Sequence, residues 1–70
     1  MPLIMAETGV IQFIKKINGK DDIKQFLKNL GFIEGGEVII ISQIQGNVIV
    51  KIKETRIAIS KTMASKIIVR

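Results

Sequence analysis

Residues 37–52, EVIIISQIQGNVIVKI, decide the fold class of this chain. Isoleucine and valine occupy most positions on both sides of a central turn, Gln45-Gly46-Asn47. Branching at Cβ restricts χ1 in a helix and packs well on a pleated sheet. The stretch therefore predicts two strands, residues 37–44 and 48–53, joined as a hairpin.

The first of these two strands is apolar on both of its faces, around residues 38–41. A strand of this kind is normally covered on both sides, but so short a chain has little material left to cover an outer face. We therefore expect part of the outer surface to meet another molecule. The isoleucines expected there are Ile39, Ile41, Ile49 and Ile68.

The rest of the chain has the same β-rich composition, with 16 isoleucines and 5 valines against 3 leucines and 3 alanines. A first strand is predicted at residues 10–17, and its inward face is expected to carry Ile11, Phe13 and Ile17. The predictions for the C-terminal part are a strand at residues 56–60 with Ile57 and Ile59 inward, a helical turn at residues 62–65, and a last strand at residues 67–69.

Helical spacing occurs once, between the first strand and the hairpin. The apolar residues Ile23, Phe26, Leu27 and Leu30 fall at positions i, i+3, i+4 and i+7 and form one stripe. Asp21 or Asp22 is predicted to cap the helix N-terminus, where a negative charge also suits the helix dipole. Gly31 stands where a left-handed C-terminal cap is needed, so the helix is expected to end at Leu30.

Five short strands with one inserted helix in a chain of 70 residues predict a mainly β protein, a small SH3-like β-barrel. No linker rich in proline or glycine and no internal repeat divides the chain, so residues 1–70 are read as a single domain. No apolar run approaches the ~20 residues that span a bilayer, and the first residues do not resemble a signal peptide. We expect a cytoplasmic protein without direct membrane insertion.

Two residue types that carry much enzyme chemistry, cysteine and histidine, are missing from the chain. Their absence removes the commonest general base, the thiol nucleophile and the soft metal ligands, so we expect no catalytic site and no cofactor. The carboxylates that remain for a hard metal ion include Asp21, Asp22, Glu34 and Glu37, and capping or turns explain each of them. We therefore expect no specific metal site.

The charge balance favours anionic partners, because 11 basic residues stand against 6 acidic ones for a net charge of +5. Single-stranded nucleic acids are bound through exposed aromatic side chains, and two of the three aromatic residues, Phe13, Phe26 and Phe32, fall at predicted core positions. We therefore expect no specific nucleic-acid site. Any binding to DNA or RNA is expected to be weak, insensitive to sequence and lost as salt rises.

Several short motifs occur in a fixed order along nearly the whole chain. They are Gly9 before the first strand, Leu27-Lys28-Asn29-Leu30-Gly31-Phe32 followed by Gly35 and Glu37-Val38, Val48-Ile49-Val50-Lys51-Ile52, Arg56-Ile57-Ala58-Ile59, and then Ala64, Ile67 and Val69. In this order they resemble the FeoA family of bacterial ferrous iron transport. The resemblance implies an SH3-like fold and a role beside FeoB, the membrane ferrous iron transporter with a cytosolic GTP-binding domain. Similar domains also end some metal-dependent repressors, so a regulatory role stays open.

From the resemblance we predict a noncatalytic accessory protein of ferrous iron uptake that binds, and regulates, the cytosolic part of FeoB. The helix and the turn after it are predicted to carry this contact, because lysines flank an apolar stripe there. The residues concerned are Lys24, Leu27, Lys28, Leu30 and Gly31. Each also has a structural explanation, since leucines at this spacing usually belong to a core and lysines are ordinary helix surface. The sequence leaves a weak homo-oligomer and a weak nucleic-acid-binding module open.

Overall fold

The structure is a computed structural model that describes all residues, 1–70. Its strands consist largely of β-branched apolar residues. In chain order the elements are η1 (Leu3–Met5), β1 (Ile11–Ile17), α1 (Asp21–Leu30), β2 (Glu37–Ile44), β3 (Asn47–Ile52), β4 (Thr55–Ser60), α2 (Lys61–Ala64) and β5 (Ile67–Val69). The strands form one antiparallel five-stranded sheet in the order β4-β3-β2-β1-β5. The predicted mainly β protein with a helix inserted after its first strand is confirmed.

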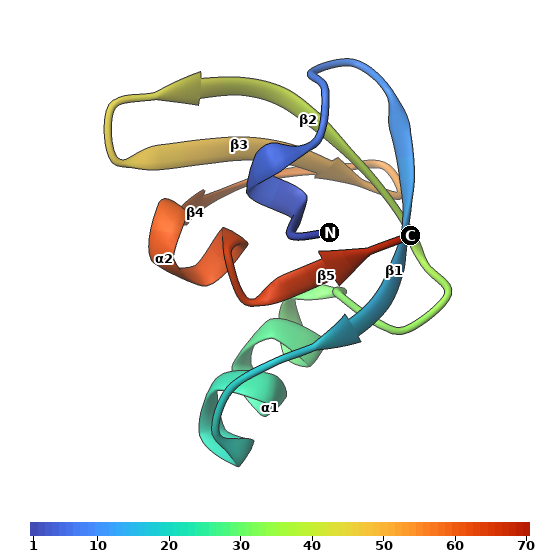
Figure 1. The fold of residues 1–70 in the computed structure, drawn as a ribbon, viewed down its shortest axis with the longest axis vertical. Helices are drawn as coiled ribbons and strands as arrows, with labels where there is room; N and C mark the ends of the chain where they lie inside the picture. The colour runs from blue at the N-terminus through green and yellow to red at the C-terminus, as the bar shows by residue number, and fades with distance from the viewer.

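The sheet is strongly curled, and the helices lie inside the curve or at one end of it (Figure 1). β4 and β5 stand at the two ends of the strand order and are not paired with one another. α1 lies at one end of the curled sheet, whereas η1 and α2 contact each other near β5 and β4 inside the curve (Figure 1). The outer side of the sheet carries no helix.

Two-residue turns join β2 to β3 and β3 to β4. Ile44 pairs with Asn47 across the first of them, so β3 begins inside the predicted turn and the predicted hairpin is confirmed. The first residue of each turn has a positive φ, 48° at Gln45 and 55° at Lys53. This backbone conformation suits the right-handed twist of paired strands, although it is costly for a residue with a side chain.

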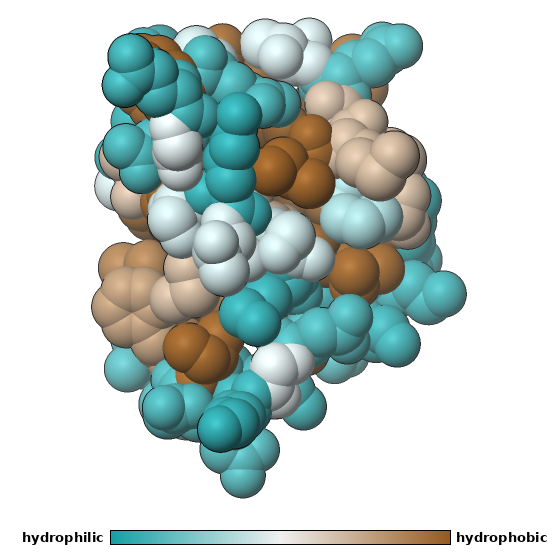
Figure 2. Space-filling view, turned by 60° about the vertical axis from the view of Figure 1, so that its left-hand side comes forward, coloured by the Kyte–Doolittle hydropathy of each residue, from teal (hydrophilic) through white to brown (hydrophobic).

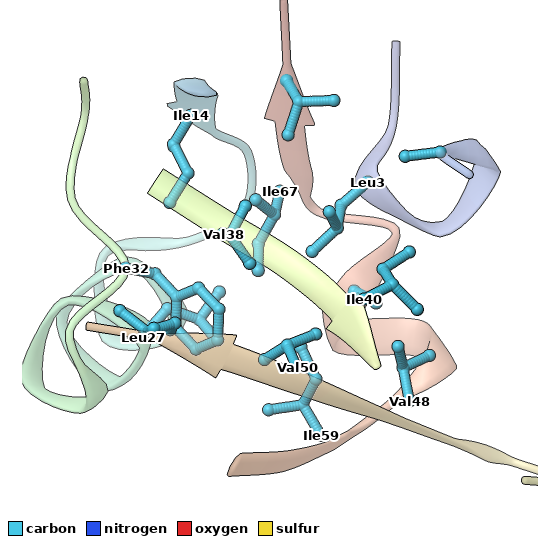
Figure 3. Close-up of a cluster of buried hydrophobic side chains, with 14 residues drawn as sticks. Leu3, Ile14, Leu27, Phe32, Val38, Ile40, Val48, Val50, Ile59 and Ile67 are labelled. Atoms are coloured by element: carbon cyan, nitrogen blue, oxygen red, sulfur yellow. The ribbon is translucent and has the colours of Figure 1, made fainter. Parts of the chain in front are cut away.

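The core is wholly apolar. Its 14 buried residues are Leu3, Ala6, Ile14, Leu27, Phe32, Val38, Ile40, Val48, Val50, Ile52, Ile59, Ala64, Ile67 and Val69, and none of the buried residues is polar or charged. Figure 3 shows Leu27 and Phe32 joining the side chains of β2 and β3 in this cluster. The core therefore binds α1 and the loop after it to the sheet.

The C-terminal part of the chain follows the sequence prediction closely. Ile59 is buried and Ile57 is half-buried, as expected for the inward face of β4. The predicted helical turn is α2, and the hydroxyl of Ser60 caps it by accepting a hydrogen bond from the Met63 amide over 3.1 Å. Serine at this position therefore marks where β4 stops and α2 begins.

β1 faces the core with a different residue from those predicted. Ile14 is fully buried, whereas Ile11 and Phe13 are 50% and 47% exposed. The strand pairs with β2 in its first half and with β5 in its second, and its register shifts between Ile14 and Lys16. An extra residue at such a bulge reverses the faces of the strand beyond it, which returns Ile17 to partial burial. The prediction that Ile11 and Phe13 point inward is therefore wrong.

The N-terminal segment completes the core, although no periodic pattern predicted it. η1 buries Leu3, and Ala6 after it is also buried. The N-terminal amine of Met1 donates a hydrogen bond to the Val69 carbonyl oxygen over 2.9 Å, and the Val69 amide donates one to the Met1 carbonyl oxygen over 2.7 Å. These contacts join the two ends of the chain, so a local reading of the sequence misses them.

Leu27→Ala is expected to lower the free energy of unfolding by about 2–5 kcal/mol, because this leucine is fully buried and truncation leaves a cavity. The control is Phe26→Ala, which alters the neighbouring residue, 49% exposed, and should cost about 1 kcal/mol or less. Urea unfolding of both variants measures the difference. Equal losses would contradict the burial that separates these two neighbours.

Candidate partner-binding surface

The two ends of α1 are fixed in different ways. Lys20 is the N-terminal capping residue, has an extended backbone and makes no side-chain capping bond, so the prediction of Asp21 or Asp22 at this position is wrong. Both aspartates already have helical backbones in the first turn, where their charges suit the helix dipole. The predicted cap at Gly31 is confirmed: its φ is 112°, and its amide donates to the carbonyl oxygens of Leu27 and of the next residue.

A cleft of about 320 Å³ opens beside α1. Its lining residues are Ile17, Lys24, Lys28, Phe32, Ile33 and Glu34. Lys24 and Lys28 lie one helical turn apart, so both ammonium groups belong to the same wall of the cleft. The exposed Ile33 and the half-buried Ile17 supply apolar surface beside them, and Glu34 adds one carboxylate. The cleft therefore combines two positive charges and one negative charge with apolar contact.

The structure separates the predicted partner-binding residues into two groups. Lys24 and Lys28 are exposed and lie together at the cleft. Leu30 and Gly31 are half-buried, and a Cβ at Gly31 would lie 3.5 Å from Cγ2 of Ile52. Leu27 is fully buried, so its side chain belongs to the core and is closed to direct contact with a partner. Partner binding by the other four stays a prediction.

Two exposed apolar residues near α1 were not predicted to lie on this surface. Ile33, 43% exposed, lines the cleft, and Phe26 is 49% exposed. Phe26 lies ~100° around the helix from Leu27, at the opposite edge of the apolar stripe, so the packing that buries Leu27 leaves Phe26 outside. Nothing local marked Ile33, because its neighbour Phe32 is the one that turns into the core.

Apolar side chains reach the surface in several separate places, each bordered by hydrophilic ones (Figure 2). Two aromatic residues contribute to this exposed set, because Phe13 is 47% and Phe26 is 49% exposed while Phe32 is fully buried. The prediction that two of the three aromatics are buried is therefore wrong. Phe13 points outward because it alternates with the buried Ile14, and Phe26 lies on a side of α1 that the core does not reach.

The chemistry available on the surface is contact and charge. No three His, Cys, Asp or Glu residues come together in a way that could hold a metal ion. No polar or charged residue is buried. No helix of the structure has the length and apolarity needed to cross a bilayer. The cleft beside α1 is therefore the candidate site, with two lysines and exposed apolar side chains for recognition.

Solved structures share this arrangement of a curled five-stranded sheet with an inserted helix. The structure of an iron uptake regulatory protein (FeoA) has a TM-score of 0.90 at 26% identity, covering 99% of this chain and 92% of that one. The zinc complex of FeoA from Stenotrophomonas maltophilia, described as a prokaryotic SH3 domain protein, has a TM-score of 0.85 at 24% identity, with coverage of 100% and 89%. The fold is therefore that of a small SH3-like domain.

The same fold occurs in a manganese-dependent transcriptional repressor, with a TM-score of 0.85 at 13% identity over 96% of this chain and 39% of that one. No curated protein sequence matches the chain. The family model of the FeoA domain matches residues 1–70. The chain therefore belongs to the FeoA family, which is linked to ferrous iron transport.

Anaerobic calorimetry with Fe²⁺ titrated into the protein is expected to give no high-affinity binding, because the carboxylates do not gather into a ligand set. One-to-one binding in the micromolar range would contradict this expectation. Loss of such binding in Asp22→Ala or Glu34→Ala would then locate the ligands at the N-terminal turn of α1 or at the cleft.

Proposed function

We propose that this chain is a noncatalytic accessory protein of ferrous iron uptake that binds the cytosolic GTP-binding part of FeoB through the cleft beside α1. The observation that carries the proposal is the pairing of Lys24 and Lys28 with the exposed Ile33 on one surface. An apolar centre with a charged rim is the usual anatomy of a protein interface. Membership of the FeoA family supplies the link to ferrous iron transport.

The partner surface is expected to be acidic around an apolar side chain that enters the cleft. Two lysines then attract its carboxylates, and Glu34 selects for a single basic group beside them. Binding at this site regulates FeoB by favouring the nucleotide-linked state that presents the matching surface, since a ligand shifts a conformational equilibrium through its difference in affinity. The protein does this in the cytoplasm, as an SH3-like domain whose core holds α1 through Leu27.

Lys24→Glu combined with Lys28→Glu is expected to weaken binding to the cytosolic domain of FeoB about tenfold or more at low salt, mainly by slowing association. Both lysines are exposed, so the fold should persist. Surface plasmon resonance at several salt concentrations measures the association rate directly.

The matched control for this double reversal is Lys16→Glu combined with Lys61→Glu. It makes the same change in net charge at two exposed lysines that do not line the cleft. We expect a smaller loss, from the long-range field alone. Equal binding by wild type and the α1 variant, with both shown to be folded, would remove the cleft from the interface.

A second candidate function is a regulatory domain like that of metal-dependent repressors, favoured by the shared fold and the net charge of +5. Weak, nonspecific binding to a DNA duplex is expected, with affinity falling steeply between about 50 mM and about 200 mM salt as counterions are released. Fluorescence anisotropy with two unrelated duplexes checks this. Selective binding to one duplex at physiological salt would favour the regulatory function.

A further inference from the structure

The outer side of the sheet presents a second surface, separate from the cleft beside α1. Strand pairing places Ile11 of β1 opposite Ile39 of β2, Ile39 opposite Lys51 of β3, and Lys51 opposite Arg56 of β4. These residues therefore form one row across four strands. Phe13 lies opposite Glu37 and extends the surface from β1 to β2. We call this surface the outer face; it consists of Ile11, Phe13, Glu37, Ile39, Lys51 and Arg56.

No other part of the chain covers the outer face, although its central strand, β2, is apolar on both sides, as strands buried on both sides usually are. Val38 and Ile40 of β2 are fully buried, while Ile39 between them is half-buried, and Ile11 beside it is 50% exposed. η1 and α2 lie inside the curl and α1 at its end, so no element packs over this side (Figure 1). Strands with two apolar faces are usually covered on both, most often by a layer of helices.

The charges of the outer face distinguish between the molecules that could cover it. Lys51 and Arg56 lie directly opposite each other, an arrangement of like charges that destabilises a sheet until an anionic group joins it. Glu37 lies beside Phe13, where it would repel a nucleic acid and would lose its hydration against a lipid surface. A second copy of a chain with net charge +5 would be repelled. The mixture of charges therefore favours another protein.

A shallow hollow beside the central strand gives such a protein a place for a side chain. Its volume is about 260 Å³, and its lining is Glu37, Ile39, Lys51, Lys53 and Glu54. It contains both charge signs around one isoleucine, as the outer face does. β2 and β3 have neighbours on both edges, so a partner approaches this region through side chains from above, which suits a helix better than an added strand.

We infer that the outer face binds an amphipathic helix of another protein. Apolar side chains of that helix, spaced at i, i+3 or i+4 and i+7, cover Ile11, Phe13 and Ile39. Its carboxylates lie over Lys51 and Arg56, and a basic side chain lies over Glu37. The inference does not depend on the identity of the partner at α1. The chain thereby offers two recognition surfaces on different elements.

Photocrosslinking in living cells tests this inference with the full chain. Phe13 is replaced by p-benzoylphenylalanine, which keeps the aromatic ring, and the crosslinked peptide is sequenced by mass spectrometry. The expected product joins position 13 to a helix of another protein that carries the apolar spacing and acidic residues described above. Lys51→Glu combined with Arg56→Glu is expected to reduce the yield at least tenfold. If the variant at Phe13 does not fold, Ile11 carries the same probe.

Two further probe positions separate the possible results. Ile33, which lines the cleft and is exposed to nearly the same extent as Phe13, reports on the proposed FeoB site, and Ile44, 57% exposed at the end of β2, gives the background. A product at position 13 with a second copy, a nucleic acid, a lipid or a segment without the described helix overturns the inference. A yield no greater than that at Ile44 also overturns it. Capture of the described helix at position 13 without FeoB at position 33 would support this inference and count against the proposed function.

Discussion

The left-handed backbone at Gly31 is the constraint on which the rest of the structure depends. It ends α1 and lets the amide of Phe32 donate to the Leu27 carbonyl oxygen over 3.0 Å, which directs the phenylalanine into the core. The loop after Phe32 then passes beside β1. There the Gly35 amide donates a hydrogen bond to the Ile14 carbonyl oxygen over 2.7 Å, and the Ile14 amide donates one to the Gly36 carbonyl oxygen over 2.9 Å. β1 changes its pairing partner from β2 to β5 at this point. The change of chain direction at Gly31 therefore determines the end of α1, the shape of the cleft and the position at which β1 changes its pairing partner.

Interactions between residues close in the sequence determine where the helices, strands and turns form. Contacts between residues far apart in the sequence determine which side chains are buried. The β-branched stretch around Gln45, the helix ending at Gly31 and the turn capped by Ser60 depend on neighbours within a few residues, so the sequence was sufficient for them. In β1 both Ile14 and Ile17 turn toward the core although they are three residues apart, because a bulge lies between them where two partner strands meet. A period of two residues cannot reveal an extra residue, because the pattern before the bulge looks regular.

Some residues of the candidate site could likewise be placed from the sequence, and others depend on contacts between distant parts of the chain. Lys24 and Lys28 could be placed together because their spacing of four residues is a property of any helix. Ile33 enters the cleft because Phe32 is held in the core, and that choice between two adjacent apolar residues depends on the reversal at Gly31. Leu27 and Phe26 show the same limit, since the spacing puts both on one stripe and only the position of the sheet decides which is buried.

Folding and recognition draw on the same apolar residues in a chain of this size. A domain of 70 residues buries only about 60% of the surface of its unfolded chain, so apolar side chains remain outside once the core is filled. Phe13 and Phe26, left on β1 and α1, contribute little to the core yet are the side chains through which a partner can gain apolar contact. A net charge of +5 makes two copies of the chain repel one another while these residues are uncovered, which opposes self-association. Small size therefore leaves aromatic side chains exposed on a positively charged surface, where they are open to apolar contact.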